Sequence, residues 1–391
     1  MKLDRGRLAV SAVFMLNGAV AGTLAARLPA LSDHLRLSTA SLGLALTMQA
    51  VGAIAVMPFA GRVVHRLGER NATRVWMAVW GVVLALPAIA PDLPVLLVAF
   101  LGVGLAAGLA DVAINSQAVM AEKRLGKPIM SSLHGLWSVG AAGGSGIGAL
   151  VTSLGIGFQA HLVTAAVVLA VLGPLSASAL PPDPADAMGG SGQTAPKPPR
   201  FSLPTGTVLL IGLVAFGAAF AEGSCTNWTA IYLNRVVHTS QGLAAIGYTV
   251  FACTMAVARL SGDRVVQRFG PVRTVRAGGL VAVGGGMIVI IARAAPLSIG
   301  GFVLLGLGIA LVVPLSFAAA GHLGPRPAQA IAGMATVSYG SSLVAPGAVG
   351  SIAGAASLPV SFMLVTALTV GIPVGARLMR SAEVAPFTQR C

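Results

Sequence analysis

A basic segment that occurs twice constrains this chain more than any other feature of its sequence. The first copy, GRVVHRLGERNATR, ends at Arg74, and the second copy, RVVQRFGPVRTVR, ends at Arg276. Arg62, Arg66 and Gly68 of the first copy also recur in the second, at one offset of about two hundred residues, which is about half of the chain. A repeat of this length predicts two homologous halves, an organisation typical of membrane transporters built from parallel repeats.

The composition indicates that lipid is the main solvent of this chain. Hydrophobic residues make up 56% of the sequence, charged residues make up only 9%, and the mean hydropathy is +0.87. A soluble domain of this length cannot bury so much apolar surface. The net charge of +14 would suggest nucleic acid as the partner of a soluble protein. Here the basic residues lie in short loops between apolar segments, so we expect lipid and no nucleic acid as partners.

Apolar segments long enough to cross a bilayer, which takes about twenty residues, recur along both halves. Between the halves, residues 181–204 are rich in Pro, Gly and Asp, a composition typical of a mobile linker. We therefore predict an all-α membrane protein of twelve transmembrane helices in two pseudo-symmetric six-helix bundles, residues 1–180 and 205–391. The predicted helices span residues 8–29, 42–60, 75–90, 95–120, 129–154, 160–180, 206–233, 243–260, 277–292, 297–320, 330–353 and 358–379.

The basic residues also predict the orientation of the chain. Successive loops between the predicted helices lie on alternate sides of the membrane. The loops on the side opposite to the two basic copies hold only four of the 25 Lys and Arg residues: Arg27, Arg36, Arg235 and Arg293. Because cytoplasmic loops carry the excess of Lys and Arg, both termini and the linker are predicted to be cytoplasmic. The preference for Arg over Lys and the abundant Ala and Gly suggest a high-GC bacterium, so we expect the bacterial inner membrane.

The first basic copy resembles the loop between helices 2 and 3 of the major facilitator superfamily, and the resemblance extends over nearly the whole chain. That loop carries the pattern Gly-x-x-x-Asp-Arg-x-Gly-Arg-Arg. The resemblance implies the major facilitator fold and gating roles for the matching residues of the two copies. These residues are Gly61, Arg66, Gly68 and Arg70 in the first copy, and Arg264, Arg268 and Gly270 in the second.

The chain departs from this pattern at its acidic position. His65 stands where the family usually has Asp, and Gln267 stands there in the second copy. The departure puts in doubt the contacts with a helix end that such an Asp would make in the outward-open state. Asp263 lies close by in the second copy, and we include it among the gating candidates.

The segment 95–120 contains an acidic residue at membrane depth. Asp111 and Asn115 share one predicted helix face with Gly104, Gly108 and Ala118. A carboxylate in lipid costs several kcal/mol, so this face must look into protein or water. Asp111 is either a proton carrier, because a buried carboxylate holds a proton more tightly than a hydrated one, or a permanently hydrogen-bonded structural residue.

The region around Asp111 is similar to the fucose:proton symporter branch, which places an acidic residue four positions before an Asn in helix 4. This resemblance implies proton coupling for Asp111 and solute recognition for Asn115. His134 occupies a polar, glycine-containing segment of helix 5, where it either contacts the solute or is satisfied by Asn115 or a backbone carbonyl. Trp137 is either a stacking surface for a sugar or a packing residue. Uncharacterised bacterial inner-membrane transporters near that branch are more similar, which leaves the solute open.

Helix 7 contains the second acidic residue at membrane depth, Glu222, which we predict to take part in proton coupling. Arg27 lies near the outer end of helix 1, and we predict that it pairs with Glu222 as an outer gate. The alternative is that Glu222 faces an aqueous vestibule without a partner. The remaining candidates for substrate binding are Asn17, Thr226 and Tyr339.

These features predict a secondary active transporter that works by alternating access, with symport of a proton and a small polar, sugar-like solute. The alternatives are proton-antiport efflux of drugs or metabolites and a non-transporting membrane sensor. No nucleophile, base and orienting group occur together, so we do not expect an enzyme. The cysteines and histidines lack metal-ligand spacing, and we expect no metal and no cofactor besides the proton gradient. We expect a monomer.

Overall fold

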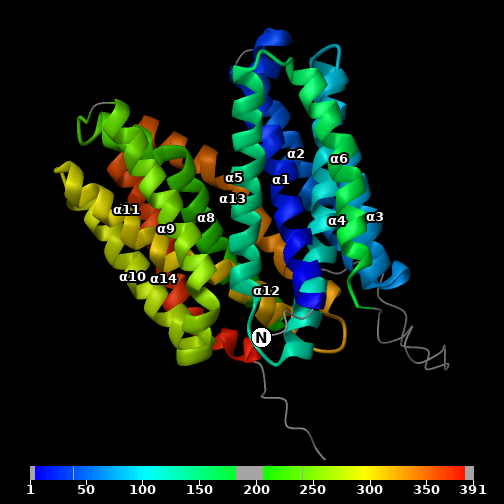
Figure 1. Cartoon of the computed structure of the whole chain (residues 1–391). Helices are drawn as coiled ribbons and strands as arrows, with labels where there is room; N and C mark the ends of the chain where they lie inside the picture. Colours follow the sequence, from blue (N-terminus) through cyan, green and yellow to red (C-terminus); the bar gives the residue numbers. More distant parts are fainter. Residues whose placement is uncertain (1–4, 38, 182–205, 240, 384–391) are drawn as a thin grey trace, which may run out of the picture. The chain divides into compact units, whose positions relative to one another are not determined.

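Helices form the regular structure of the chain. The computed structural model describes residues 5–37, 39–181, 206–239 and 241–383, and no strand occurs in these ranges. Figure 1 shows the long helices of both halves. The first half contains α1 (Arg5–His34), α2 (Thr39–Leu67), α3 (Glu69–Val83), the short 3-10 helix η1 (Leu86–Ile89), α4 (Leu93–Leu125), α5 (Met130–Ser153) and α6 (Phe158–Ser178).

The second half repeats the order of the six long helices, except that the fourth is divided in two, and its 3-10 helix lies at the end. It contains α8 (Gly206–Arg235), α9 (Gln241–Phe269), α10 (Pro271–Ile291), α11 (Ala295–Ile309), α12 (Val312–Gly321), α13 (Pro327–Ala355), α14 (Leu358–Gly375) and the 3-10 helix η2 (Ala376–Ala382). The predicted span 297–320 is interrupted at Ala310 and Leu311, so that α11 and α12 together take its place. Its counterpart α4 is continuous. The predicted all-α membrane fold is confirmed, whereas residues 182–204 of the predicted linker lie outside the described residues.

The helices have the length and the surface that a bilayer requires. In the described ranges, nine helical segments are long and apolar enough to cross a membrane. Helices α5 and α13 have comparable lengths, but frequent Gly and Ser residues make them less apolar. Large apolar side chains lie on the surface of both halves, for example Val98, Ile291 and Val374, which are 69%, 68% and 77% exposed. Lipid is the solvent that such a surface fits.

The chain packs as two compact units, each containing one of the basic copies. Unit 1 consists of residues 1–125, 133–203 and 326–332, and unit 2 consists of residues 126–132, 204–325 and 333–391. Each unit therefore includes the first turn of a helix whose remainder belongs to the other unit, α5 in one case and α13 in the other. This exchange was not anticipated in the predicted bundles.

The repeat in the sequence is also a repeat in backbone geometry. Gly68 precedes α3 with φ 75° and ψ 151°, and Gly270 precedes α10 with φ 77° and ψ 158°. Residues other than glycine rarely adopt such positive φ values. The two glycines of the basic copies thus allow the same tight connection between successive helices in each unit.

Candidate functional site

Three polar side chains of unit 1 form a connected chain of hydrogen bonds. Asn115 Nδ2 donates to Asp111 Oδ1 at 3.1 Å and to the carbonyl oxygen of Asp111 at 2.9 Å. His134 Nε2 lies 3.2 Å from Asn115 Oδ1, and Ser138 Oγ donates to the carbonyl oxygen of His134 at 3.2 Å. Asn115 is fully buried, whereas Asp111 and His134 are half-buried. The acid of α4 is therefore linked through one buried amide to the histidine of α5.

Helix α1 completes this polar cluster. The ring of Phe14 lies 5.5 Å from the ring of His134, measured between centroids. One turn further along α1, a Cβ on Gly18 would lie 2.0 Å from the carbonyl oxygen of Trp137, so only glycine permits this approach of α1 to α5. Asn17 is buried on α1 and Trp137 is half-buried on α5. Unit 1 thus brings Asp111, Asn115 and His134 together and places Asn17 and Trp137 on the α1 and α5 segments that pack nearby.

Arg27 connects three parts of unit 1. Its Nε donates to His161 Nδ1 at 2.9 Å, its Nη2 donates to the carbonyl oxygen of Ile156 at 3.0 Å, and its Nη1 donates to Thr152 Oγ1. Arg27 is 2% exposed. The predicted pair of Arg27 with Glu222 is therefore corrected: the guanidinium fastens α1 to the ends of α5 and α6 within its own unit.

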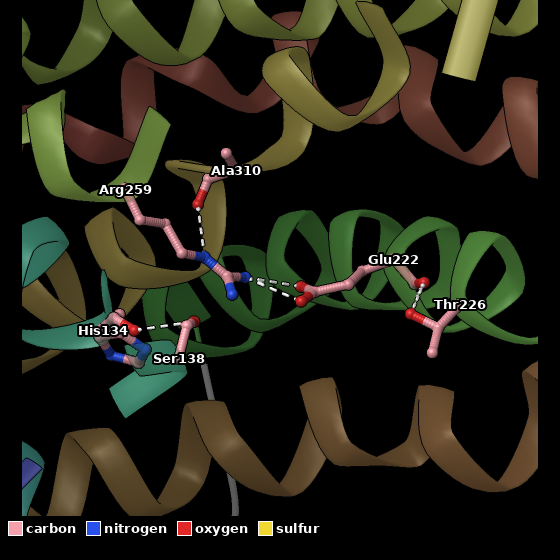
Figure 2. A network of polar contacts seen from close by, with 6 residues as sticks. All are labelled: His134, Ser138, Glu222, Thr226, Arg259 and Ala310. Atoms are coloured by element: carbon pink, nitrogen blue, oxygen red, sulfur yellow. Dashed lines mark hydrogen bonds and ion pairs between the residues drawn. The ribbon is translucent and has the colours of Figure 1, made fainter. Parts of the chain in front are cut away.

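Glu222 of α8 pairs with an arginine of unit 2. Arg259 Nη2 lies 2.9 Å from Glu222 Oε1 and 2.8 Å from Oε2. Figure 2 shows both carboxylate oxygens directed at this guanidinium. The side chain of Arg259 is 9% exposed and that of Glu222 is 31% exposed. The alternative of an unpartnered Glu222 is therefore also incorrect.

Arg259 also donates a hydrogen bond to the backbone at the interruption of the predicted span 297–320. Its Nε donates to the carbonyl oxygen of Ala310 at 3.3 Å, at the end of α11. Carbonyl groups at a helix end have no partner within the helix, and a basic side chain is one of the groups that can supply it. The sequence analysis did not single out Arg259. The signal that could have identified it is its position inside the apolar segment 243–260, where an arginine needs a counter-ion.

Two other candidates of unit 2 lie on α8 and α13. Thr226 is exposed, and its hydroxyl donates to the backbone carbonyl of Glu222 at 2.9 Å, one turn earlier in α8 (Figure 2). Tyr339 is half-buried on α13. Their predicted contact with a solute stays a prediction.

The first basic copy makes its contacts within unit 1. A Cβ on Gly61 would lie 2.7 Å from Gln329 Cα, so α2 packs closely on the first turn of α13. Arg70 Nη2 donates to the carbonyl oxygen of Ser178 at the end of α6. Arg66 and His65 are exposed in the last turn of α2.

In the second basic copy, a charged residue stands where the first copy has Gly61. Asp263, which stands at the repeat position of Gly61, accepts a hydrogen bond from the backbone nitrogen of Ser132 at 3.1 Å. Ser132 lies in the first turn of α5, where backbone N–H groups favour a negative charge. Asp263 is buried, while Arg264 and Arg268 are exposed. An aspartate therefore does contact a helix end in this chain, one helical turn before the position at which the family pattern places it.

Comparisons with known proteins cover almost all of the chain. The family model of the Major Facilitator Superfamily matches residues 10–347. An uncharacterized transporter of Sinorhizobium fredii is 36% identical over 362 residues, which are 91% of this chain and 93% of that protein. An uncharacterized MFS-type transporter of Yersinia pestis is 34% identical over 93% of each chain. Among solved structures, the fucose:proton symporter FucP in its outward conformation gives a TM-score of 0.75 at 15% identity, covers 95% of this chain and 97% of that chain, and thereby shows a shared fold.

Proposed function

This chain belongs to the Major Facilitator Superfamily of membrane transporters, and we propose that it is a symporter that moves a small polar, sugar-like solute together with a proton. Its family and the names of its relatives indicate a transporter and not an enzyme. Alternating access of the two units, driven by the proton gradient without a cofactor, is the mechanism that we infer from the repeat. We further infer that both termini lie in the cytoplasm, on the basis of the uneven distribution of Lys and Arg. A monomer and a location in a bacterial inner membrane stay predictions.

The observation that carries the proposal is the hydrogen-bonded chain Asp111–Asn115–His134. Asn115 donates to the carboxylate through Nδ2, so its Oδ1 is left to accept from His134 Nε2. A hydrogen bond to an ionised carboxylate is stronger than one to its neutral form. Protonation of Asp111 therefore weakens its hydrogen bond with Asn115, and the hydrogen bond between Asn115 and His134 weakens in turn. The binding of a proton and the positions of two solute-binding candidates are thereby linked.

Glu222 is less suited to carry the proton. Its carboxylate receives two contacts from a guanidinium that is itself anchored to the backbone at Ala310. Both carboxylate oxygens are thus occupied by one anchored side chain of the same unit. We therefore assign proton coupling to Asp111 and keep Glu222 as part of an ion pair that maintains unit 2. The name of the fucose:proton symporter, which shares the fold, supports a sugar-like solute.

The test is uptake into proteoliposomes that contain the purified full-length chain. Radiolabelled fucose, other monosaccharides and polyols are offered with and without an inward proton gradient. We expect at least one of these solutes to accumulate above its external concentration, and the accumulation to vanish when a protonophore is added. Asp111→Asn should lose this accumulation yet keep exchange of labelled for unlabelled solute, because exchange needs no net proton movement.

Asp33→Asn provides the matched control, because Asp33 is exposed near the end of α1. This variant should accumulate solute like the unmodified protein. Accumulation by Asp111→Asn at the unmodified level would refute the role of Asp111. Accumulation driven only by an outward proton gradient would replace symport with antiport.

A further inference from the structure

Four arginines gather around a pocket at one end of unit 2. The pocket has a volume of about 370 Å³ and is lined by Arg273 and Arg276 of α10, Arg377 and Arg380 of η2, and Glu383. All four arginine side chains are exposed. Among the described residues, none of their guanidinium groups takes part in a hydrogen bond or an ion pair. Four positive charges are thus held together near one carboxylate that binds none of them, and their mutual repulsion favours a bound anion.

The backbone at this pocket also favours an anion. Helix α10 begins at Pro271, directly beside the pocket-lining Gly270. No side chain caps this helix, and its first turn contains no acidic residue. The first N–H groups of a helix point outward and carry partial positive charge, and phosphate groups commonly bind there.

An apolar groove continues from the basic pocket. It has a volume of about 380 Å³, lies between α9, α10 and the α11–α12 pair, and shares Phe269 and Arg273 with the basic pocket. Its rim includes Phe269, Val265 and Leu307, which are 51%, 36% and 47% exposed. At its floor, a Cβ on Gly278 would lie 2.6 Å from the carbonyl oxygen of Gly308. Because the two helices touch through glycines, the space above this contact contains no side chain.

We propose that the basic pocket and the apolar groove together bind one anionic phospholipid. Its phosphate lies among the four arginines, and one acyl chain lies along the groove. A free phosphate ion would use the arginines but would leave the exposed groove unfilled, so the lipid accounts for both features. The excess of basic residues places this end of unit 2 on the cytoplasmic side of the membrane, where anionic headgroups attract basic pockets between helices.

In the described part of unit 1, two charged residues at the repeat-related corner have partners of their own. Helix α3 begins with Glu69, whose carboxylate accepts a hydrogen bond from Ser116 Oγ at 2.8 Å. Arg70 donates to the carbonyl oxygen of Ser178. Glu69 and Arg70 at this corner thus have hydrogen-bond partners inside unit 1. Positions at this corner therefore serve as matched controls for an experiment.

Native mass spectrometry of the purified full-length chain tests the proposal. The probes are dioctanoyl phosphatidylglycerol, dioctanoyl phosphatidylcholine and inorganic phosphate, each titrated separately. Phosphatidylglycerol should bind with a stoichiometry of one and more tightly than phosphatidylcholine. Each basic residue near an anionic lipid surface contributes about 1 kcal/mol, so Arg377→Gln combined with Arg380→Gln should raise the dissociation constant by about thirtyfold.

Matched single variants distinguish the binding of phosphatidylglycerol at this site from its general attraction to a positively charged protein. Arg276→Gln should raise the dissociation constant of phosphatidylglycerol by about fivefold. Arg74→Gln, at the repeat position in unit 1, should leave it unchanged. Ala277→Trp fills the groove from its rim and should weaken binding, whereas Val75→Trp, at the corresponding position of unit 1, should not.

Two results would overturn the proposal. Equal affinity for phosphatidylcholine and phosphatidylglycerol would show that the arginines do not select the headgroup. Binding of inorganic phosphate as tight as that of phosphatidylglycerol, unaffected by Ala277→Trp, would show an anion site without a lipid. Because the guanidinium groups of these arginines make no hydrogen bond or ion pair within the described part of the chain, their replacement should leave the fold intact, and thermal unfolding verifies this.

Discussion

The two units each place an acidic residue inside a long helix but give it different partners. Asp111 of unit 1 bonds to the neutral amide of Asn115, which continues to His134. Glu222 of unit 2 bonds to the permanently charged Arg259. An amide carries no net charge, whereas a guanidinium places a permanent positive charge beside the carboxylate. The two halves thus hold their acidic residues in different ways, in a hydrogen-bonded chain in one and in an ion pair in the other.

The largest expected effect concerns pH. If one proton binds with the solute at Asp111, the affinity for the solute falls as the pH rises, by up to tenfold per pH unit where Asp111 deprotonates. Asp111→Asn should remove this dependence. Glu222→Gln should retain it, because in the proposed mechanism the proton binds at Asp111 of the other unit. Solute affinity measured by isothermal titration calorimetry across pH checks the contrast, and a flat profile in Glu222→Gln would reverse the two assignments.

The next effect concerns the ion pair of unit 2. Arg259→Gln leaves Glu222 without its counter-charge and the carbonyl group of Ala310 without its donor. Breaking a fully buried pair costs 3–5 kcal/mol. The side chain of Glu222 is 31% exposed, so we expect a loss of about 2 kcal/mol in the free energy of unfolding.

Denaturant unfolding in detergent measures this loss, and Arg264→Gln on the exposed face of the same helix is the control. Arg259→Met combined with Glu222→Leu removes both charges and should recover most of the lost stability. A double variant as unstable as Arg259→Gln would mean that the bond to Ala310, and not the pairing of charges, dominates.

The smallest effect concerns Asp263 and its repeat counterpart Gly61. Asp263→Asn keeps a side-chain acceptor for the backbone nitrogen of Ser132 but removes the charge beside the start of α5. The charge at a helix N-terminus contributes about 0.3–1 kcal/mol. Hydrogen exchange of the amides in the first turn of α5 should therefore accelerate about two- to fivefold. Arg268→Gln, in the last turn of the same helix, should leave this exchange unchanged, and unchanged exchange in Asp263→Asn would show that the charge is not what holds the helix.

The parts of this structure that were predictable from the sequence depend on local spacing. The apolar segments give the helices, the repeat gives two halves, and the spacing of Asp111 and Asn115 gives their contact within one helix. The link from Asn115 to His134 was one of two interpretations, since their similar depths do not reveal which helix faces meet. The hydrophobicity of a segment fixes the depth of its residues in the membrane, and it does not fix the rotation of the helix about its axis.

The parts that were not predictable depend on partners distant in the sequence. Arg259 lies five residues before Arg264 of the second basic copy, and a linear pattern does not show that its side chain contacts Glu222. Arg27 was paired by symmetry, but Thr152 and His161 of the same unit satisfy it. The interruption at Ala310 is different, because a local signal was available: Pro314 has no N–H group to bond the carbonyl of Ala310 four residues earlier, and the apolar length of the segment 297–320 was given more weight.

The pair of Glu222 and Arg259 has a consequence for the electrical balance of transport. Since the two charges cancel, unit 2 adds no net charge at this depth of the membrane. Under the proposed mechanism with a neutral solute, the proton on Asp111 is then the charge on which the membrane potential acts. A potential of 100 mV contributes about 2.3 kcal/mol per elementary charge, enough to sustain an accumulation of roughly fiftyfold even when the pH is equal on both sides.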